Sequence, residues 1–201
     1  MCTLYTQTTA HEAMVRMFQP VRSFAGNLGP TEVYPDRNAP IIKNGPLGRE
    51  MIMGRRGMPT PPQFIKGKAD RGVVNIRNTA SPHWRRWLGP DNRCLVPFDG
   101  FAEPGPGGTI WFELSDKAKQ GVFAGLWTEW TSIRKVKDGE STDQLFGFLT
   151  CPPNAEVASV HPKAMPVILT DPEDWEIWLR APWEIAKNLQ RPLPDSSLRT
   201  V

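Results

Sequence analysis

Short apolar runs, separated by turn residues, dominate the hydrophobic pattern of the chain. Runs rich in β-branched and aromatic residues predict strands, whereas apolar residues spaced three and four positions apart predict helices. The predicted strands are 2–7, 41–43, 50–53, 73–76, 93–97, 109–115, 122–131, 145–151 and 165–170. The predicted helices are 11–18, 81–88, 171–180 and 182–190. Many short strands with a few helices indicate an α+β fold dominated by antiparallel pairing.

Local signals add detail to these elements. Asn44-Gly45 predicts the turn of a hairpin between the second and third strands. Segments 109–115 and 122–131 are expected to pair with each other. Segment 133–143 is charged and is expected to form a mobile loop.

Capping residues and core positions can also be assigned. Thr9 is expected to cap the first helix, in which Met14, Met17 and Phe18 face the core. Ser81 opens the second predicted helix. After the last helix, the chain is expected to end in a tail.

Composition limits the class of protein. The 201 residues fit one domain, 1–201, and 21 prolines against 17 glycines indicate many turns. No apolar run could span a bilayer and the first residues do not resemble a signal peptide, so we expect a soluble, cytoplasmic protein. Cys2, Cys94 and Cys151 lack metal-type spacing, so we expect free thiols, no metal and no cofactor.

Positive charge is concentrated between Arg55 and Arg93. Nine basic residues lie there against two acidic ones, Asp70 and Asp91, an excess of seven. The basic residues are Arg55, Arg56, Lys66, Lys68, Arg71, Arg77, Arg85, Arg86 and Arg93. Such a cluster is a candidate footprint for a polyanion such as nucleic acid, and a solvated face that binds nothing is an equally good interpretation.

The first two residues, Met1-Cys2, allow unusual chemistry. Removal of Met1 would leave a terminal cysteine whose α-amine and thiol titrate at about 8 and about 8.5. The amine can condense with an aldehyde to an imine, and the thiol can then close a five-membered ring. Taken alone, the dipeptide is better explained by chance.

Three further positions carry polar groups at strand ends. If Ile76 faces the core, Asn75 and Arg77 share the opposite face and offer an amide beside a phosphate-binding guanidinium. Asn75 could equally satisfy backbone groups of a loop. Glu103 follows an apolar strand, where burial would raise its pKa and suit a general acid, or it is an exposed loop acid.

His161 lies between two apolar strands. A lone histidine in such a place usually satisfies a structural hydrogen bond. Thr150 ends the preceding strand and could hydrogen-bond into the same space.

Together, in this order, the motifs resemble the SRAP family of SOS response-associated peptidases, also described as abasic-site-processing proteins. The resemblance covers residues 2 to about 180, with a tail at about 190–201. It is carried by Cys2, NIRN, RCLVPFDGFAE, FAGLWTEW, FLT with PNAEV, and VHPKAMPVIL. It implies a single SRAP-like domain with a barrel-like, mainly antiparallel β core.

The chain departs from the family pattern in three places, which marks it as a divergent branch. The usual start M-C-G-R is Met1-Cys2-Thr3-Leu4 here. The family's F-[YF]-E-W is FAEP, and the histidine motif has one extra residue before Met165.

The resemblance implies capture of abasic sites in single-stranded DNA. The opened sugar exposes an aldehyde, and the aminothiol of Cys2 would trap it as a thiazolidine DNA–protein crosslink. Peptidase activity is implied only as the removal of Met1 from the chain's own start.

Site residues follow from the same resemblance. Asn75 would position the Cys2 amine or the sugar, and Glu103 would protonate the sugar ring oxygen and assist reversal. His161 would hold the sugar hydroxyl. DNA contacts would come from Arg77 at a phosphate and Pro35 as a wedge against bases, with Thr150, Arg85 and Arg86 alongside.

Two other functions use the same residues. A cysteine peptidase or amidohydrolase would employ Cys2 as nucleophile and His161 as base, but leaves the basic cluster unexplained. A non-catalytic single-strand-binding module would rely on arginine and tryptophan contacts. We expect a monomer that binds single-stranded DNA with abasic sites, has no membrane partner and associates with the nucleoid when bound to DNA.

Overall fold

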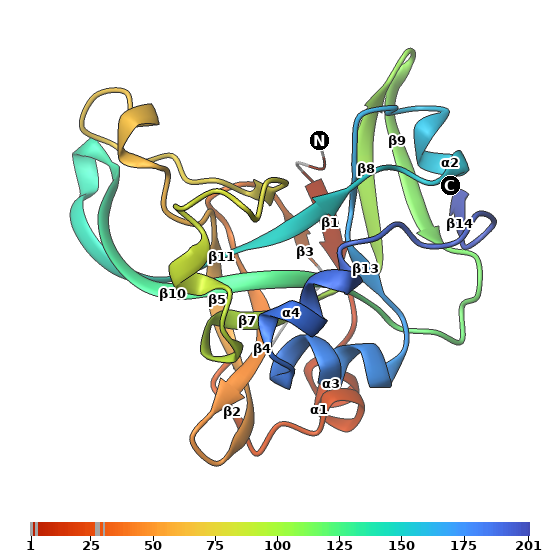
Figure 1. Cartoon of the computed structure of the whole chain (residues 1–201), viewed down its shortest axis with the longest axis horizontal. Helices are drawn as coiled ribbons and strands as arrows, with labels where there is room; N and C mark the ends of the chain where they lie inside the picture. Colours follow the sequence, from red (N-terminus) through yellow and green to blue (C-terminus); the bar gives the residue numbers. More distant parts are fainter. Residues whose placement is uncertain (1, 3, 27–28, 30) are drawn as a thin grey trace.

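The computed structural model describes residues 2, 4–26, 29 and 31–201. Two sheets make up most of the described chain (Figure 1). The smaller sheet has the order β14-β9-β8-β1-β3, with bounds β1 (Leu4–Gln7), β3 (Thr31–Val33), β8 (Gly100–Gly105), β9 (Gly108–Leu114) and β14 (Leu198–Thr200).

The larger sheet follows the order β12-β11-β10-β7-β4-β5-β2, with β13 paired to β10 and β6 paired to β11. Its strands are β2 (Arg22–Ser23), β4 (Asn38–Gly45), β5 (Gly48–Arg56), β6 (Asn75–Ile76), β7 (Arg93–Phe98), β10 (Gly121–Lys135), β11 (Gly139–Cys151), β12 (Met165–Pro166) and β13 (Ile168–Leu169).

Short helices lie around these sheets. The α-helices are α1 (His11–Phe18), α2 (Ala155–Ala158), α3 (Pro172–Arg180) and α4 (Trp183–Ala186). The 3-10 turns are η1 (Pro62–Phe64), η2 (Arg85–Trp87), η3 (Pro90–Asn92), η4 (Val136–Asp138) and η5 (Lys187–Leu189). No helix in the described part of the chain is both long and apolar enough to cross a bilayer.

Aromatic rings join the two sheets into one core. Phe98 and Phe123 stack at 4.0 Å between ring centroids, and Tyr5 from the smaller sheet meets Phe123 edge-on at 5.5 Å. Phe148 of β11 lies 4.4 Å from Phe123. The N-terminal strand β1 is therefore fixed both by its strand neighbours and by ring packing underneath.

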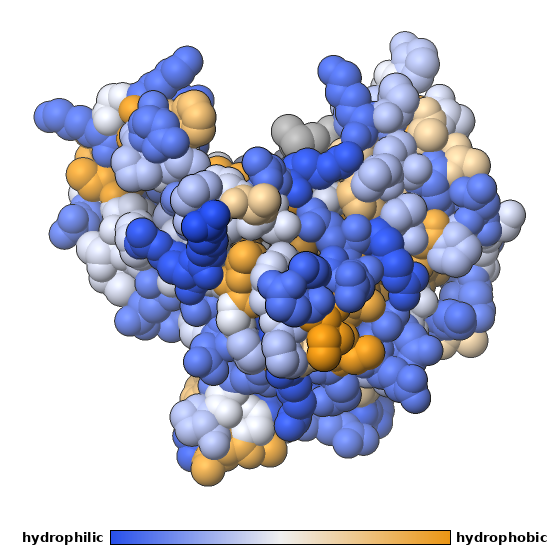
Figure 2. Space-filling model, viewed as in Figure 1, coloured by the Kyte–Doolittle hydropathy of each residue, from blue (hydrophilic) through white to orange (hydrophobic). Residues whose placement is uncertain are grey.

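Two arms rise on either side of β1. Figure 1 shows one arm formed by the far end of the β10–β11 hairpin with the loop around η1, and the other by the β8–β9 hairpin. Figure 2 shows the same face hollowed between these arms. The start of β1 thus lies on the floor of a groove.

The predicted fold class, an α+β fold with a mainly antiparallel, barrel-like β core and peripheral helices, is confirmed. The first helix spans the predicted residues, with Met14 and Phe18 buried and Met17 partly buried against the core. Its predicted cap is wrong: the helix starts after Ala10 without a side-chain cap, and Thr9 instead donates to Asp99.

Pairing between distant segments corrects other predictions. The strands at 109–115 and 122–131 do not pair, because β9 pairs with β8 and β14 while β10 pairs with β7, β11 and β13. The charged segment 133–143 is the end of the β10–β11 hairpin rather than a mobile loop. The C-terminal tail returns as β14.

Two local predictions also fail. Gly45 pairs with Gly48, so Pro46 and Leu47 form the hairpin turn instead of Asn44-Gly45. The segment 81–88 forms turns and only the short η2 instead of a helix, and Trp84 and Trp87 are both buried there.

Candidate active site

Cys2 lies two residues before β1 and is buried, at 1% exposure. Its carbonyl oxygen accepts two hydrogen bonds, from Asn75 Nδ2 at 3.0 Å and from Arg56 Nη2 at 2.9 Å. The thiol donates weakly to the Leu4 carbonyl at 3.4 Å. Burial raises the pKa of the Cys2 thiol to about 12, so the sulfur is protonated near neutral pH.

Strand pairing brings Glu103 to the same place. Leu4 of β1 pairs with Ala102 of β8, and Glu103 is the next residue of β8. Its side chain is 0% exposed, and burial raises the pKa of its carboxyl group. The negative charge of Glu103 in turn raises the pKa of Cys2. Glu103 therefore lies within a strand and is buried, rather than in an exposed loop.

Arg56, at the end of β5, is also 0% exposed and holds the start of the chain. Besides the Cys2 carbonyl it donates to Val33 O at 2.8 Å. Its guanidinium lies 5.1 Å from the ring centroid of Tyr5 and 4.8 Å from that of Phe148. Two carbonyl groups and two aromatic faces compensate the cost of burying this charge.

Asn75 and Thr150 add polar atoms that have spare hydrogen-bonding capacity. Asn75 lies on β6, opposite Phe148 of β11, and Thr150 follows on β11. Asn75 Oδ1 and Thr150 Oγ1 are both buried and have no hydrogen-bond partner among the described residues. Buried polar atoms are normally satisfied, so these two can serve a ligand or water in the groove.

Arg77 lies at the exposed edge of the same region. Its Nη1 donates to Cys151 O at 2.8 Å and to Lys163 O at 3.3 Å, so it joins the end of β11 to the histidine segment. Gln190 Nε2 donates to the carbonyls of Arg77 and Thr150, at 2.9 and 3.0 Å. The alternation around a buried Ile76 that was predicted from the sequence is present.

His161 follows α2 and is half-buried. Its backbone N–H donates to Val157 O at 2.7 Å. The preceding residue, Val160, packs against β8: a Cβ on Gly105 would lie 3.3 Å from its Cγ1. Burial, together with the positive charge of Lys163, lowers the pKa of His161, which keeps the ring neutral at physiological pH.

Pro35 is exposed on the turn between β3 and β4, and Asp36 anchors this turn. The Asp36 backbone N–H donates to Arg56 O at 2.9 Å. Burial disfavours the charged form of Asp36, but hydrogen bonds from Arg55 at 2.8 and 3.0 Å and from Arg134 at 3.2 Å outweigh it and lower the pKa. The predicted wedge is therefore held on a fixed turn.

The predicted basic footprint is smaller than the sequence indicated. Arg55 is engaged by Asp36 and Asp143, and Arg56 and Arg93 are both 0% exposed. Burial lowers the pKa of Arg93 to about 10. The basic residues that remain exposed are Lys66, Lys68, Arg71, Arg77, Arg85 and Arg86.

The contacts form two groups of predicted site residues. Asn75 and Glu103 meet Cys2, whereas Arg77, Thr150 and the histidine segment meet at the end of β11. Arg85 and Arg86 lie on η2, where the Arg86 guanidinium lies 5.4 Å from the Trp87 ring centroid.

Sequence reasoning missed the positioning roles of Arg56, Tyr5 and Gln190. Arg56 was visible only as one charge in a basic cluster. The strands that bury it come from the start and the second half of the chain. No group of three or more histidine, cysteine, aspartate or glutamate side chains suited to a metal ion occurs in the part of the chain that the structure describes.

Known proteins resemble this chain in sequence family and in fold. A crystal structure of a protein from Bacteroides thetaiotaomicron is 18% identical, with a TM-score of 0.78 over 99% of this chain and 90% of that one. Another, from Bordetella bronchiseptica, is 24% identical, with a TM-score of 0.74 over 100% and 98%. A search of curated proteins found no match. The family model described as SOS response associated peptidase (SRAP) matches residues 1–201, and the chain therefore belongs to the SRAP family.

Proposed function

We propose that the protein captures abasic sites in single-stranded DNA through Cys2, once Met1 has been removed, as a covalent thiazolidine crosslink. Family membership supports a function associated with the response to DNA damage. The observation that carries the finer proposal is the fixation of Cys2. Asn75 and Arg56 both donate to its carbonyl, and the buried Glu103 is close enough to influence its thiol.

The reaction needs no oxidant or cofactor. The free Cys2 amine attacks the sugar aldehyde, a C–N bond forms, and one water leaves to give an imine. The thiol then adds to the imine carbon: a C–S bond forms and the thiol proton passes to the nitrogen. Water release is the only change in composition.

Glu103 suits the acid role in this sequence. Its raised pKa keeps a larger fraction protonated near neutral pH, so it can donate to the sugar ring oxygen as the ring opens. Its carboxylate can then accept a proton from the Cys2 thiol, whose pKa of about 12 makes unassisted ionisation rare. The neutral His161 and the unpartnered Thr150 hydroxyl would receive the opened sugar.

Removal of Met1 belongs to the same proposal. While Met1 is attached, the Cys2 nitrogen is an amide and cannot condense with an aldehyde. Hydrolysis of the Met1–Cys2 bond frees the amine, and this is the peptidase step we assign to the chain itself.

A cysteine peptidase acting on other proteins is less well supported. Activated cysteines have lowered pKa values, whereas burial raises that of Cys2. The alternative of a non-catalytic single-strand-binding module would rely on arginine and tryptophan contacts and would not use the buried Cys2.

Intact mass spectrometry tests the proposal. Protein whose mass shows loss of Met1 is incubated with a single-stranded oligonucleotide that carries one abasic site. The expected product has the summed masses of protein and oligonucleotide minus one water. Cys2→Ala should reduce crosslink to background while DNA affinity changes less than about twofold, because Cys2 is almost fully buried.

Two matched controls define the result. Cys151→Ala removes another buried thiol and should leave the crosslink intact. An oligonucleotide with a tetrahydrofuran site lacks the aldehyde and should not crosslink. If the protein binds the oligonucleotide but its mass does not change, the non-catalytic binding module is favoured. If the protein hydrolyses added peptides, the cysteine peptidase is favoured.

A further inference from the structure

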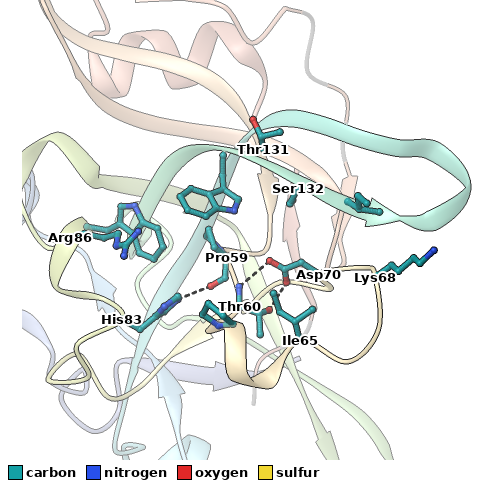
Figure 3. A pocket seen from close by; sticks show the side chains of 13 residues that line it. Pro59, Thr60, Ile65, Lys68, Asp70, His83, Arg86, Thr131 and Ser132 are labelled. Carbon is teal, nitrogen blue, oxygen red and sulfur yellow. Dashed lines mark hydrogen bonds between the residues drawn. The ribbon is translucent and has the colours of Figure 1, made fainter.

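A second cavity lies away from Cys2, on the arm that carries η1. Its volume is about 330 Å³ and its walls come from three segments: the loop before β6, the turn around η2, and β10 (Figure 3). This volume is at the small end of ligand pockets, which span about 300–1,000 Å³. It suits one planar group the size of a nucleobase.

Aromatic rings form one side of the cavity. Trp87 and Trp130 line it with ring centroids 5.9 Å apart, and His83 lies 5.2 Å from Trp87. Trp87 is buried, whereas Trp130 is only partly buried and keeps accessible ring surface. An accessible indole beside an apolar wall is a stacking surface for a base.

Polar groups stand among the apolar ones. Ser132 lines the cavity, and its Oγ is buried and has no hydrogen-bond partner among the described residues. A hydroxyl both donates and accepts, so it can pair with the polar edge of any base. Lys68 and Arg86 also line the cavity, and Figure 3 shows them on different sides of it.

The loop that forms the cavity wall is fixed at its base. Gly57 and Gly72 cross so closely that a Cβ on Gly72 would lie 2.8 Å from the Gly57 Cα, and both have positive φ. Arg134 donates to Gly57 O at 3.1 Å and to Arg71 O at 3.3 Å. Asp70 accepts from the Thr60 N–H at 3.0 Å. The cavity is therefore preformed, which lowers the entropy cost of binding.

The cavity is connected to the candidate active site through the chain. His83 follows Arg77 by six residues, which span at most about 20–22 Å when extended. A strand with about 3.4 Å per nucleotide covers that distance in about six nucleotides. A DNA strand held at Arg77 can therefore present a neighbouring base to the cavity.

We propose that this cavity is a base-binding subsite, which takes one extruded nucleobase of the same strand within about six nucleotides of the abasic site. The inference rests on the proposed function and deepens it. Arg86 and Lys68 contact the phosphates beside that base, and Trp130 stacks on it.

Affinity measured with a set of oligonucleotides tests the subsite. Each oligonucleotide carries a central tetrahydrofuran site and lacks one further base, at one of the six positions on either side. For the wild type, deletion at one position should weaken binding by about 5- to 150-fold, as loss of one stacked base does. Deletions elsewhere should have much smaller effects.

Variants assign that sensitive position to the cavity. Trp130→Ala should weaken binding of the intact strand by the same factor and remove the sensitivity to base deletion. Trp183→Ala, another partly buried tryptophan on α4, should retain it. Ser132→Leu fills the cavity without removing a ring. It should also weaken binding and remove the sensitivity to base deletion, so it tests the subsite even if Trp130→Ala folds poorly.

The outcomes separate the two proposals. The subsite proposal is overturned if the wild type binds every base-deleted oligonucleotide with equal affinity. It is also overturned if Trp130→Ala weakens binding but the same position stays sensitive to base deletion. Crosslinking of a saturating abasic oligonucleotide is scored independently. If a crosslink forms but affinity does not depend on any flanking base, only the subsite proposal is wrong. If affinity depends on one base but no crosslink forms, the subsite is supported and the proposed crosslinking chemistry is wrong.

Discussion

Arg56 and Arg77 both belong to the candidate active site, but their surroundings differ completely. Arg56 is fully buried, donates to the carbonyls of Val33 and Cys2, and lies over two aromatic rings. Arg77 is exposed and joins β11 to the histidine segment. The difference divides the site into a buried half and an exposed half; in the function proposed above, the first would position the reacting groups and the second would meet the DNA backbone.

The two halves should respond differently to mutation. Changes in the buried half should alter the crosslinking rate at saturating DNA. Changes in the exposed half should alter affinity and its dependence on salt. A variant that breaks this rule would show that the division is wrong.

Glu103→Gln should have the largest effect of the three variants considered next. Loss of a general acid slows a reaction by about 10²- to 10⁴-fold, whereas DNA affinity should not change because the side chain is buried. Single-turnover crosslinking at saturating DNA measures the rate. Glu113→Gln, on the adjacent strand β9, is the control and should react at the wild-type rate.

The pH dependence gives a second test of Glu103. Because burial raises its pKa, the acid remains protonated to higher pH, and the wild-type rate should fall as pH rises through that pKa. The glutamine variant should lack this fall. The stability of the fold should also fall as pH rises. The folded state binds the Glu103 proton more tightly than the unfolded state, so the free energy of unfolding declines between pH about 4.3, the ordinary pKa of glutamate, and the raised pKa of Glu103. Thermal unfolding of the glutamine variant should not show that decline.

Arg56→Met should slow crosslinking by about 10- to 100-fold, because small misplacements of a reacting group have effects of that size. It should also lower the free energy of unfolding by about 1–3 kcal/mol, since the Val33 carbonyl loses the hydrogen bond that Arg56 donates. Chemical denaturation and single-turnover rates measure the two effects.

Arg93→Met is the matched control for this variant. Arg93 is equally buried, but it donates to the Ala181 carbonyl and lies over Trp178, away from Cys2. It should lose stability and keep the crosslinking rate. If both variants slow crosslinking to the same degree, Arg56 has only a structural role.

Arg77→Ala should have the smallest effect, a loss of affinity of up to about fivefold, as expected for an exposed charge pair. The slope of log affinity against log salt should decrease by about 0.7, the value for one phosphate contact of a single strand. The crosslinking rate at saturating DNA should stay close to wild type. Arg16→Ala, an exposed arginine on α1, should change neither quantity; an unchanged slope for Arg77→Ala would remove its phosphate role.

The sequence was informative where local pattern decides structure. The helix predicted at 11–18 has a spacing of three and four residues, and the strands predicted at 93–97 and 145–151 are short, largely apolar runs; neither signal needs a distant partner to interpret. It was misleading where pairing is non-local. Residues 133–143 are polar and charged, yet they form the end of a hairpin, because 139–143 of β11 pair with residues 130–135 of β10.

Burial of charge was the feature least accessible from sequence. Nothing local distinguishes Arg56 from Arg77, since both follow short apolar segments. The rings that cover Arg56 come from Tyr5 and Phe148, which approach it only in the folded sheets. The position of Arg85 and Arg86 depends in the same way on where η2 packs.

The pairing of β1 with β8 has a consequence for biosynthesis. Leu4 pairs with Ala102, so the strand that fixes Cys2 cannot dock until about half of the chain has left the ribosome. At about 5–20 residues per second, translation of that length takes about 5–20 s. Throughout this interval Leu4 lacks its partner on β8, and the buried surroundings of Cys2 are incomplete. The removal of Met1 that we assign to the folded chain therefore follows this interval.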